Sequence, residues 1–473
     1  MYNELMEKLG KYGQEHVLSF WGELGPDEQK KLSAQIDVID WDYIDGLIKE
    51  YVLKKSTVAV PENLLPAPFF PLIPANGEMQ KKYNEARSRG VELLKAGKVA
   101  ALTVAGGQGT RLGFDGPKGT FPISPVKKKT LFQYFAESIS RISAKYGKPL
   151  HWFIMTSEMN DRETRDFFEA NSFFGLMPSC VSFFTQGTMP AVGYDGKLLL
   201  GAKSSLALSP NGHGGTLLAL RLSGCLEKMK SSGIDVISYF QVDNPLAPIA
   251  DPLFIGLHSL EKSEISAKML PKTGPYEKLG NFCMVNGKLH IIEYSDMPAK
   301  LAEERKADGP LRFLAGSPAI HMISREFAEK LTANGKLELP WHKADKKVPC
   351  IDANGNSVNP SVPNAIKLES FIFDALPMAS KTMILEGARE NEFAPVKNPS
   401  GVDSAESCRA MLIERDAKRL EKAGFKIPRK SDGSPDCLIE LSPRSAVDDE
   451  DAAELFIKNK NLNFLHGEEL YLE

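Results

Sequence analysis

Residues 102–113 read Leu-Thr-Val-Ala-Gly-Gly-Gln-Gly-Thr-Arg-Leu-Gly, and Pro117, Lys118 and Gly119 follow closely. This pattern predicts a buried strand that runs into a glycine-rich loop, because a short apolar run precedes several residues without a Cβ atom. Such a loop folds tightly around a phosphate chain and turns its N–H groups inward. Arg111 and Lys118 supply the positive charge that a polyphosphate requires. We therefore expect a nucleoside triphosphate to bind at this loop.

The two commoner glycine-rich loops do not match this segment. A dinucleotide-binding fingerprint that starts at Gly107 needs a glycine where Leu112 stands. A P-loop requires Gly-Lys-Ser/Thr, and that tripeptide does not follow these glycines. Taken alone, the segment leaves open a tight strand-to-helix turn with a solvated Arg111.

Composition excludes several classes of protein. The chain has 473 residues, which predicts two or three domains. A net charge of -3 gives no electrostatic footprint for nucleic acid, and no apolar run approaches the ~20 residues that span a bilayer. The first residues lack the features of a signal peptide, and the 6 scattered cysteines form no Cys-x-x-Cys motif. We expect a cytoplasmic protein, a monomer or weak homo-oligomer, with neither nucleic acid nor membrane as a partner.

Apolar periodicity predicts the order of the elements. Helical spacing indicates helices over residues 1–55, and strands are expected at 99–104, 152–155 and 236–240. The segment after Thr130 has apolar residues at helical spacing, with Thr130 as its N-cap. This alternation predicts an α/β fold, a Rossmann-like mixed and mainly parallel sheet flanked by helices. Ligands of such sheets sit beyond the carboxyl ends of the strands, where the glycine-rich loop falls.

Three domains follow from this organisation. They are an N-terminal helical region over residues 1–55, a catalytic domain over 56–390 and a small C-terminal domain over 391–473. The lysine run 127–129 is expected on a solvated face, near enough to the phosphate loop for a steering role.

Residues 102–119 also resemble the signature of the UDP-sugar pyrophosphorylases, Leu-x-x-Gly-Gly-x-Gly-Thr-x-Leu-Gly-x-x-x-Pro-Lys-Gly. The form Ala-Gly-Gly-Gln-Gly-Thr-Arg-Leu is typical of their UDP-N-acetylglucosamine branch. The resemblance implies a nucleotidyltransferase (GT-A-like) fold and a uridylyltransferase that joins UTP and a hexose 1-phosphate. It implies catalytic roles for Arg111 and Lys118. The residues that it places against the nucleotide are Gly106, Gly107, Gln108, Gly109 and Thr110.

Two further segments resemble the family's uracil site. Residues 184–191 resemble the segment whose glutamine reads uracil, which assigns this role to Gln186. A side-chain amide suits the role because it can donate to one atom of a pyrimidine edge and accept from another. Residues 209–215 form a second glycine-rich loop, in which Gly212 matches the position that contacts uracil.

Asp243 follows the apolar run 236–240, and the resemblance assigns it to Mg²⁺, for which Mn²⁺ may substitute. A carboxylate is a ligand that this hard cation prefers. From the residues alone, an aspartate that opens a loop and caps the next turn stays open as the alternative.

The sugar is less well specified by the sequence. Gly280, Glu293 and Tyr294 lie in segments that resemble the sugar-binding segments of the N-acetylglucosamine branch. His213 and Ser317 stand where that branch typically has asparagine. Gly-His-Gly is the form of the UDP-glucose and broad-specificity enzymes. N-acetylglucosamine 1-phosphate is the preferred reading, and glucose 1-phosphate or a broad specificity is the alternative.

Residues 392–398 match the family's Phe-x-Pro-x-Lys-Asn, in which the lysine reaches the sugar phosphate, and this makes Lys397 the third catalytic residue. Phe371 and Phe373 resemble the wall of the sugar pocket, but core packing explains them equally well and they receive no site role. An alternative of another class is a nucleotide-sugar-binding regulator without turnover. Such a protein would be expected to lose Lys118, Asp243 or Lys397, and all three are present.

Overall fold

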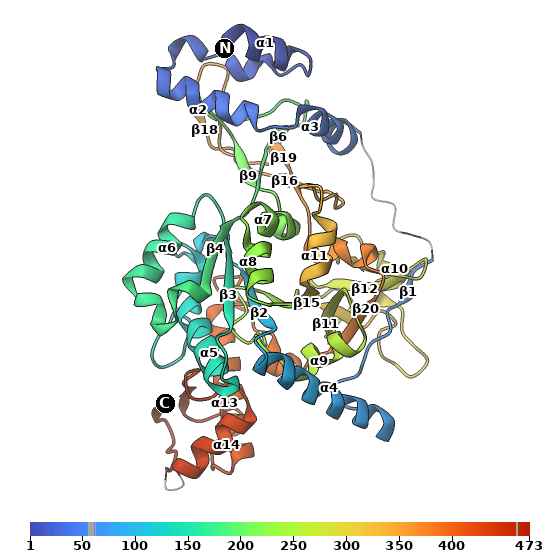
Figure 1. The fold of residues 1–473 in the computed structure, drawn as a ribbon, viewed down its shortest axis with the longest axis vertical. Coiled ribbons are helices and arrows are strands. Elements are labelled where there is room, and N and C mark those ends of the chain that lie inside the picture. Colours follow the sequence, from blue (N-terminus) through green and yellow to red (C-terminus); the bar gives the residue numbers. More distant parts are fainter. Residues whose placement is uncertain (55–60, 62, 460–461) are drawn as a thin grey trace. The chain divides into compact units, whose positions relative to one another are not determined.

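A computed structural model describes residues 1–473 except 55–60, 62 and 460–461. The chain forms two compact units, each built from separate stretches of sequence (Figure 1). Unit 1 comprises Met1–Ala59, Gln186–Gly215 and Glu338–Asp374, and unit 2 comprises Val60–Thr185, Thr216–Leu337 and Ala375–Glu473. The predicted boundary between 55 and 56 lies outside the described residues, and the boundary between 390 and 391 stays a prediction.

Unit 1 contains the predicted N-terminal helices. They are α1 (Tyr2–Gly10), α2 (Pro26–Asp37) and α3 (Trp41–Leu47), with short 3-10 turns at Glu15–Leu18 and Trp21–Glu23 and a π-helical turn at Ile48–Leu53. Their apolar stripe packs in one buried cluster with residues of several short strands. The short strands of unit 1 as a whole are β5 (Thr188–Pro190), β6 (Val192–Gly193), β7 (Leu200–Ala202), β8 (Ser205–Leu206), β9 (Leu208–Pro210), β16 (His342–Lys346), β17 (Cys350–Ile351), β18 (Ser357–Val358) and β19 (Ala365–Glu369).

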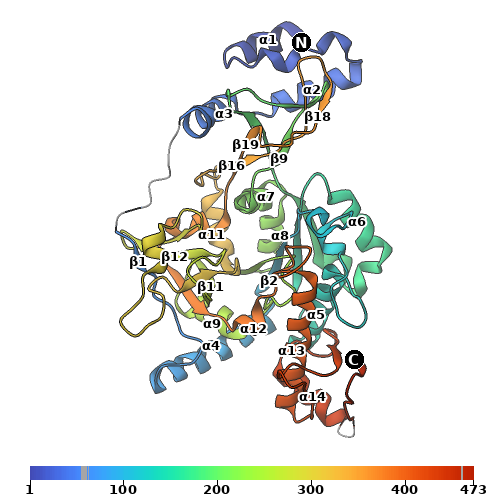
Figure 2. The same cartoon turned by 180° about the vertical axis from the view of Figure 1, so that it is seen from behind.

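Unit 2 is organised around one 11-stranded sheet, whose main order is β1-β12-β14-β11-β15-β10-β2-β3-β4. The predicted strands are confirmed as β2 (Val99–Val104), β3 (His151–Thr156) and β10 (Val236–Gln241). The other members are β1 (Leu65–Pro66), β4 (Val181–Thr185), β11 (Ile265–Pro271), β12 (Gly280–Val285), β13 (Lys288–Ile292), β14 (Ala315–Ser317), β15 (His321–Ser324) and β20 (Thr382–Glu386). Figure 2 shows the same sheet from behind.

The mixed α/β sheet is confirmed, and its two halves differ in strand direction. Strands β10, β2, β3 and β4 run parallel to one another, as expected for short runs that are buried on both faces. Strand β15 is antiparallel to both β10 and β11, and β12 pairs antiparallel with β13 and β14. The β12–β13 hairpin turns at Asn286-Gly287, whose φ angles of 49° and 77° suit a type I′ turn. Parallel order is therefore confined to the half with the glycine-rich loop and to the β11–β20 pair.

The helices of unit 2 include the predicted one after Thr130. It is α5 (Leu131–Tyr146), and the Thr130 side chain accepts a hydrogen bond from Gln133 N–H at its start. The others are α4 (Gly77–Lys95), α6 (Asp161–Ala170), α7 (Thr216–Leu222), α8 (Cys225–Ser231), α9 (Pro252–Leu260), α10 (Ala299–Glu303), α11 (Arg325–Leu331), α12 (Arg389–Glu392), α13 (Ala405–Ala423) and α14 (Asp449–Lys458). None of the described helices is long and apolar enough to cross a membrane.

The C-terminal part of unit 2 has a small apolar cluster of its own. Helices α13 and α14 pack side by side, as Figures 1 and 2 both show, next to a parallel pair of short strands. These strands are β21 (Leu438–Leu441) and β22 (Glu469–Leu472).

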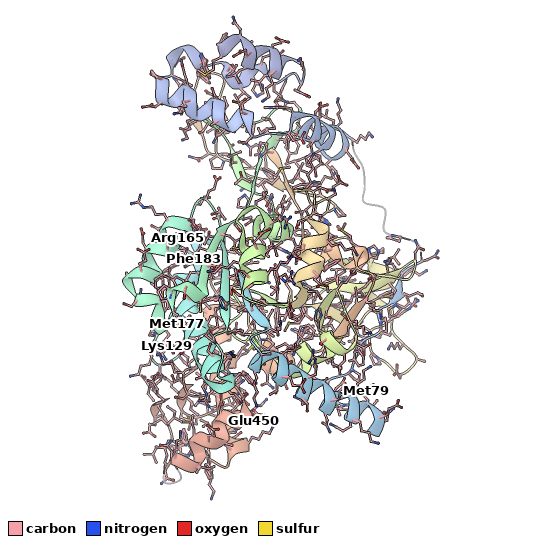
Figure 3. All side chains as sticks on the ribbon, in the orientation of Figure 1. Met79, Lys129, Arg165, Met177, Phe183 and Glu450 are labelled. Atoms are coloured by element: carbon pink, nitrogen blue, oxygen red, sulfur yellow. The ribbon has the colours of Figure 1, made fainter. Side chains whose placement is uncertain are left out.

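Lys129, labelled in Figure 3, corrects the expectation of a solvated lysine run. Its side chain is only 6% exposed, and its ammonium donates to Glu137 at 2.6 Å and to the Tyr471 hydroxyl at 2.8 Å. Burial disfavours the ammonium, but these two partners together raise the pKa of Lys129 above its ordinary value. The side chain ties β22 to α5 and is not available for steering phosphates. Lys127 and Lys128 are exposed, as expected.

We expect Lys129→Ala to lower the free energy of unfolding by up to about 3–5 kcal/mol, because the buried Glu137 carboxylate then keeps only Arg444, at 3.4 Å, as a cationic partner. Denaturant unfolding measures this change. The neighbouring variant Lys128→Ala, at an exposed position, should stay within about 0.5 kcal/mol of the wild type. Equal effects of the two variants would contradict the structural role of Lys129.

Candidate active site

The carbonyl groups of the glycine-rich loop are held by side chains at the start of α6. The buried Asn160 amide donates to Ala105 O at 2.9 Å and to Gly107 O at 3.2 Å. The Ser157 hydroxyl donates to Gly106 O at 2.8 Å. Three successive carbonyls are thus satisfied within the protein. Sequence reasoning gave Ser157 and Asn160 no role, since a side chain that orients a backbone has no compositional signature.

The N–H groups of the same loop are left for a ligand. Within the part of the chain that the structure describes, the N–H groups of Gly106, Gly107 and Gln108 have no hydrogen-bond acceptor. The buried Oε1 of Gln108 likewise lacks a partner there. Gly106 and Gln108 are half-buried and Gly107 is exposed. Donors without acceptors in the protein, beside a buried amide oxygen without a partner, fit a loop that binds a polar molecule.

The loop closes on itself and brings Lys118 back to its beginning. Gly109 N–H donates to Gly116 O at 2.9 Å, and Lys118 N–H donates to Gly107 O at 3.0 Å. Thr110–Leu112 form a 3-10 turn between these contacts, and Arg111 within it is exposed. The exposed guanidinium and the half-buried Lys118 therefore lie on one short loop at the carboxyl end of β2.

Lys118 and Asp243 are brought together as the sequence predicts. Asp243 comes just after β10, which runs parallel to β2 with Gln241 opposite Val104. The Lys118 ammonium lies 3.5 Å from the Asp243 carboxylate, and the two side chains are 16% and 11% exposed. A cation and an anion are thus held at the carboxyl ends of two neighbouring parallel strands, the place where ligands of such sheets bind.

The segment that carries Lys397 is joined to the residues after β10. Val396 N–H donates to Asp243 O at 2.8 Å. The Asn244 amide donates to Glu392 O at 2.8 Å and accepts from Ala394 N–H at 2.9 Å. These three hydrogen bonds hold the segment 392–396 against the residues after β10, and Lys397 is the next residue of that segment. Asn244 is a further residue that sequence reasoning left without a role.

A buried ion cluster anchors the same segment. The Lys268 ammonium, with a side chain only 2% exposed, contacts Asp251 at 2.7 Å and Glu392 at 2.8 Å. Burial opposes its charge, but the two carboxylates together raise the pKa of Lys268, so the side chain stays protonated. Breaking a buried pair of this kind costs about 3–5 kcal/mol. The pair with Lys268 therefore holds Glu392, at the start of the Lys397 segment, in place.

Asp243 is suited to Mg²⁺ only together with substrate phosphates. The described residues contain no group of three or more His, Cys, Asp or Glu side chains that could hold a metal ion. Mg²⁺ commonly takes one or two protein carboxylates and completes its shell with water and phosphate oxygens. One partly accessible carboxylate beside a phosphate-binding loop fits this mode, and it does not fit a closed zinc site.

In unit 1, Gln186 and Gly212 are in contact. The Gln186 amide donates to Gly212 O at 2.6 Å, which leaves its Oε1 and its second N–H for a ligand. Gly212 has a φ of 85°, and a Cβ atom there would lie 2.2 Å from Ser370 O. Only glycine fits this position, since both the backbone conformation and the space exclude a side chain.

His213 packs in a group of aromatic rings of unit 1. Its Nδ1 accepts a hydrogen bond from Ile372 N–H at 3.2 Å, so the neutral imidazole carries its proton on Nε2. Its ring lies 5.2 Å from Phe371 and 5.9 Å from Phe373, measured between centroids. The two phenylalanines were left without a site role, and their contact with His213 now makes them candidates for one.

Three of the predicted sugar-binding residues meet in unit 2. The antiparallel register pairs Gly280 of β12 with Ser317 of β14. Glu293 directly follows β13, and a Cβ atom on Gly280 would lie 3.4 Å from its Oε1. Tyr294, next in the chain, is 44% exposed. The structure brings Gly280, Glu293 and Ser317 together on the β12–β14 part of the sheet.

Comparison with known proteins places the chain in a family. Residues 51–456 match the family model described as UTP–glucose-1-phosphate uridylyltransferase. The chain belongs to this family. It is a uridylyltransferase of the UDP-sugar pyrophosphorylase type, as the glycine-rich signature predicts, and its substrates are UTP and a sugar 1-phosphate.

Relatives cover nearly all of the chain. The UDP-N-acetylhexosamine pyrophosphorylase-like protein 1 of Homo sapiens is 35% identical over 93% of this chain and 92% of its own length. The UDP-N-acetylglucosamine diphosphorylase 1 of Arabidopsis thaliana is 35% identical over 93% of this chain and 88% of its own length. The crystal structure of the uridine diphosphate N-acetylglucosamine pyrophosphorylase of Trypanosoma brucei matches with a TM-score of 0.82 at 26% identity, covering 100% of this chain and 98% of that one. The predicted fold and enzyme class are thereby confirmed.

We expect activity to require Mg²⁺ or Mn²⁺ and to fall at least about 100-fold in Asp243→Ala, since loss of one charge-stabilising contact costs about 2.7–4 kcal/mol in the transition state. Steady-state rates with and without a chelator test this. Asp235→Ala, at the exposed residue directly before β10, is the matched control and should keep wild-type activity. Full activity after chelation would remove Asp243 from its metal role.

Lys118→Ala and Lys397→Ala should each lower kcat by about 100-fold or more for the same reason. Lys118→Ala should act mainly on the kinetics of UTP, and Lys397→Ala mainly on those of the sugar 1-phosphate. Initial rates with each substrate varied in turn separate the two effects. Lys95→Ala, at an exposed position on α4, is the control, and wild-type turnover in both site variants would show that the site is misplaced.

Proposed function

We propose that the protein acts in the cytoplasm and makes UDP-N-acetylglucosamine and pyrophosphate from UTP and N-acetylglucosamine 1-phosphate. The names of two relatives support this sugar, since the Arabidopsis thaliana protein is a UDP-N-acetylglucosamine diphosphorylase and the Trypanosoma brucei protein is a uridine diphosphate N-acetylglucosamine pyrophosphorylase. The observation that carries the proposal is the convergence of Lys118, Asp243 and the Lys397 segment at the carboxyl ends of β2 and β10.

The reaction requires positioning and charge neutralisation, and no protein nucleophile. A sugar phosphate is largely dianionic at pH 7, because its second pKa is about 6, and it attacks the α-phosphorus of UTP directly. In this proposal Arg111 and Lys118 hold the phosphates of UTP, and Lys397 holds the attacking phosphate. Gly106–Thr110 of unit 2 are assigned to nucleotide binding, and so are Gln186 and Gly212 of unit 1. Mg²⁺, or Mn²⁺ in its place, would supply charge neutralisation on phosphate oxygens at Asp243.

The aromatic rings beside His213 support N-acetylglucosamine. The half-buried Phe371 ring beside His213 supplies an apolar surface suited to the acetamide methyl group.

Glucose 1-phosphate remains the second candidate because of Ser317. Ser317 stands opposite Gly280 in the sheet, and its hydroxyl is shorter than the asparagine amide of the N-acetylglucosamine branch. Tyr294, Glu293 and Gly280 can contact the hydroxyl groups that both sugars share, so they do not discriminate between the two.

A pyrophosphate-release assay with UTP and the 1-phosphates of N-acetylglucosamine, glucose and galactose tests the sugar. We expect the highest kcat/KM for N-acetylglucosamine 1-phosphate. The paired change Ser317→Asn with His213→Asn should raise that preference by up to about 30-fold, since two contacts of about 1 kcal/mol each are altered. The single variant Tyr43→Phe, at an exposed position on α3, is the control. A kcat/KM more than about tenfold higher for glucose 1-phosphate would reverse the assignment.

A further inference from the structure

Unit 1 contains a histidine–aspartate pair beside the aromatic rings that surround His213. His342 is the first residue of β16, and Asp374 follows β19, the strand that pairs with β16 (Figure 1). The Nε2 atom of His342 lies 2.9 Å from the Asp374 carboxylate, and the two side chains are 27% and 13% exposed. A carboxylate only accepts hydrogen bonds, so Nε2 carries a proton and donates it. This hydrogen bond fixes the orientation of the imidazole.

The turn that carries Asp374 lies directly against the loop that carries His213. Asp374 N–H donates to Phe371 O at 3.1 Å, and Gly214 N–H donates to Ser370 O at 2.8 Å. A Cβ atom on Gly214 would lie 2.6 Å from Phe371 N. The backbones of the turn and the loop are therefore held together, and the carboxylate of Asp374 is supplied from a fixed position.

The imidazole of His342 packs against the ring of Phe371. The two ring centres are 4.6 Å apart, and the ring planes are tilted by 34°. The same Phe371 ring lies 5.2 Å from His213 and 5.1 Å from Phe373, measured between centroids. Tilted or offset rings about 4.5–7 Å apart attract one another. Asp374 thus restrains the His342 ring, which contacts the ring that contacts His213.

Apolar packing alone does not account for a polar pair at this place. Phe373, only 7% exposed, shows that the cluster accommodates an apolar ring. An apolar side chain at position 342 would cover Phe371 without the cost of desolvating two polar groups. It would lack a hydrogen bond that selects a single orientation of the ring, which a fully satisfied polar contact provides. The pair therefore supplies orientation, and the ring that it orients is the half-buried Phe371.

We propose that the His342–Asp374 pair determines specificity by holding the Phe371 ring in the orientation that accepts the N-acetyl group of the sugar. The inference rests on the proposed function, in which Phe371 offers an apolar surface to the acetamide methyl group. Asp374 orients the imidazole, and the imidazole orients Phe371, so neither side chain has to touch the substrate. Both are positioning residues, and their effect falls on the choice between sugars and not on UTP.

The preference between two sugars tests the proposal. It is the ratio of kcat/KM for N-acetylglucosamine 1-phosphate to kcat/KM for glucose 1-phosphate, measured on one preparation so that the amount of folded protein cancels. We expect His342→Ala and Asp374→Ala each to lower this ratio about three- to tenfold, the value of one aromatic contact, while KM for UTP stays within twofold. A wild-type ratio in either alanine variant would overturn the proposal.

Two further variants separate the orienting hydrogen bond from charge and from general effects. Asp374→Asn keeps an acceptor oxygen, so its ratio should stay within twofold of the wild type. A loss as large as that of Asp374→Ala would contradict the orienting role of the hydrogen bond. The matched control is His466→Ala, since His466 is 75% exposed and pairs with Asp436 at 2.7 Å. Its ratio should equal that of the wild type, and an equal loss there would count against the proposal.

A double-mutant cycle tests whether His342 acts through Phe371. In the Phe371→Ala background, His342→Ala should change the ratio less than twofold, because the ring that it positions is gone. A full loss in both backgrounds would show an independent effect and overturn the proposal. A lowered ratio in Phe371→Ala alongside an unaffected His342→Ala contradicts only this inference. A wild-type enzyme that prefers glucose 1-phosphate, or a wild-type ratio in Phe371→Ala, contradicts the proposed sugar site and this inference together.

Discussion

The hydrogen bond from Val396 N–H to Asp243 O, 2.8 Å long, is the constraint on which the candidate site depends. Together with the Asn244 contacts, one of which spans 150 residues of sequence, it joins the end of β10 to the segment that carries Lys397. The buried contact of Lys268 with Glu392 holds the beginning of that segment. Because these contacts satisfy buried polar groups, moving either segment would leave them unpaired at a cost of about 1–3 kcal/mol each.

This constraint suits a reaction between two anions. The negative Asp243 and the positive Lys118 and Lys397 are fixed to backbone that the sheet and its hydrogen bonds hold in place. Charges that are already oriented stabilise a transition state without reorganising when it forms. Lys118 lies 3.5 Å from Asp243. The lysine has the opposite charge to the substrate phosphates, and the aspartate has the opposite charge to the metal ion that would accompany them. The sugar phosphate supplies its own nucleophilic oxygen, so the protein needs no general base among these residues.

Local patterns predicted a large share of the fold, and long-range contacts account for the rest. Strand β2 and the Thr130-capped helix follow from apolar periodicity and a capping residue within a few positions, and both are confirmed. The antiparallel β12–β13 hairpin has a local signal in Asn286-Gly287, which the prediction left out. Lys129 could not be placed, because its partner Tyr471 is 342 residues away in sequence. The roles of Asn160 and Asn244 were missed for the same reason, since an amide that binds distant backbone looks like any loop residue.

A crystal structure of the full chain with Mg²⁺ and its UDP-sugar product tests the central claim most directly, namely that Lys118, Asp243 and Lys397 form one phosphate-handling group. The account predicts an Asp243 carboxylate oxygen about 2.0–2.1 Å from the metal. It also predicts the Lys397 ammonium within about 3 Å of an oxygen of the sugar-linked phosphate. A product bound with its phosphates away from Asp243 and Lys397 would contradict it.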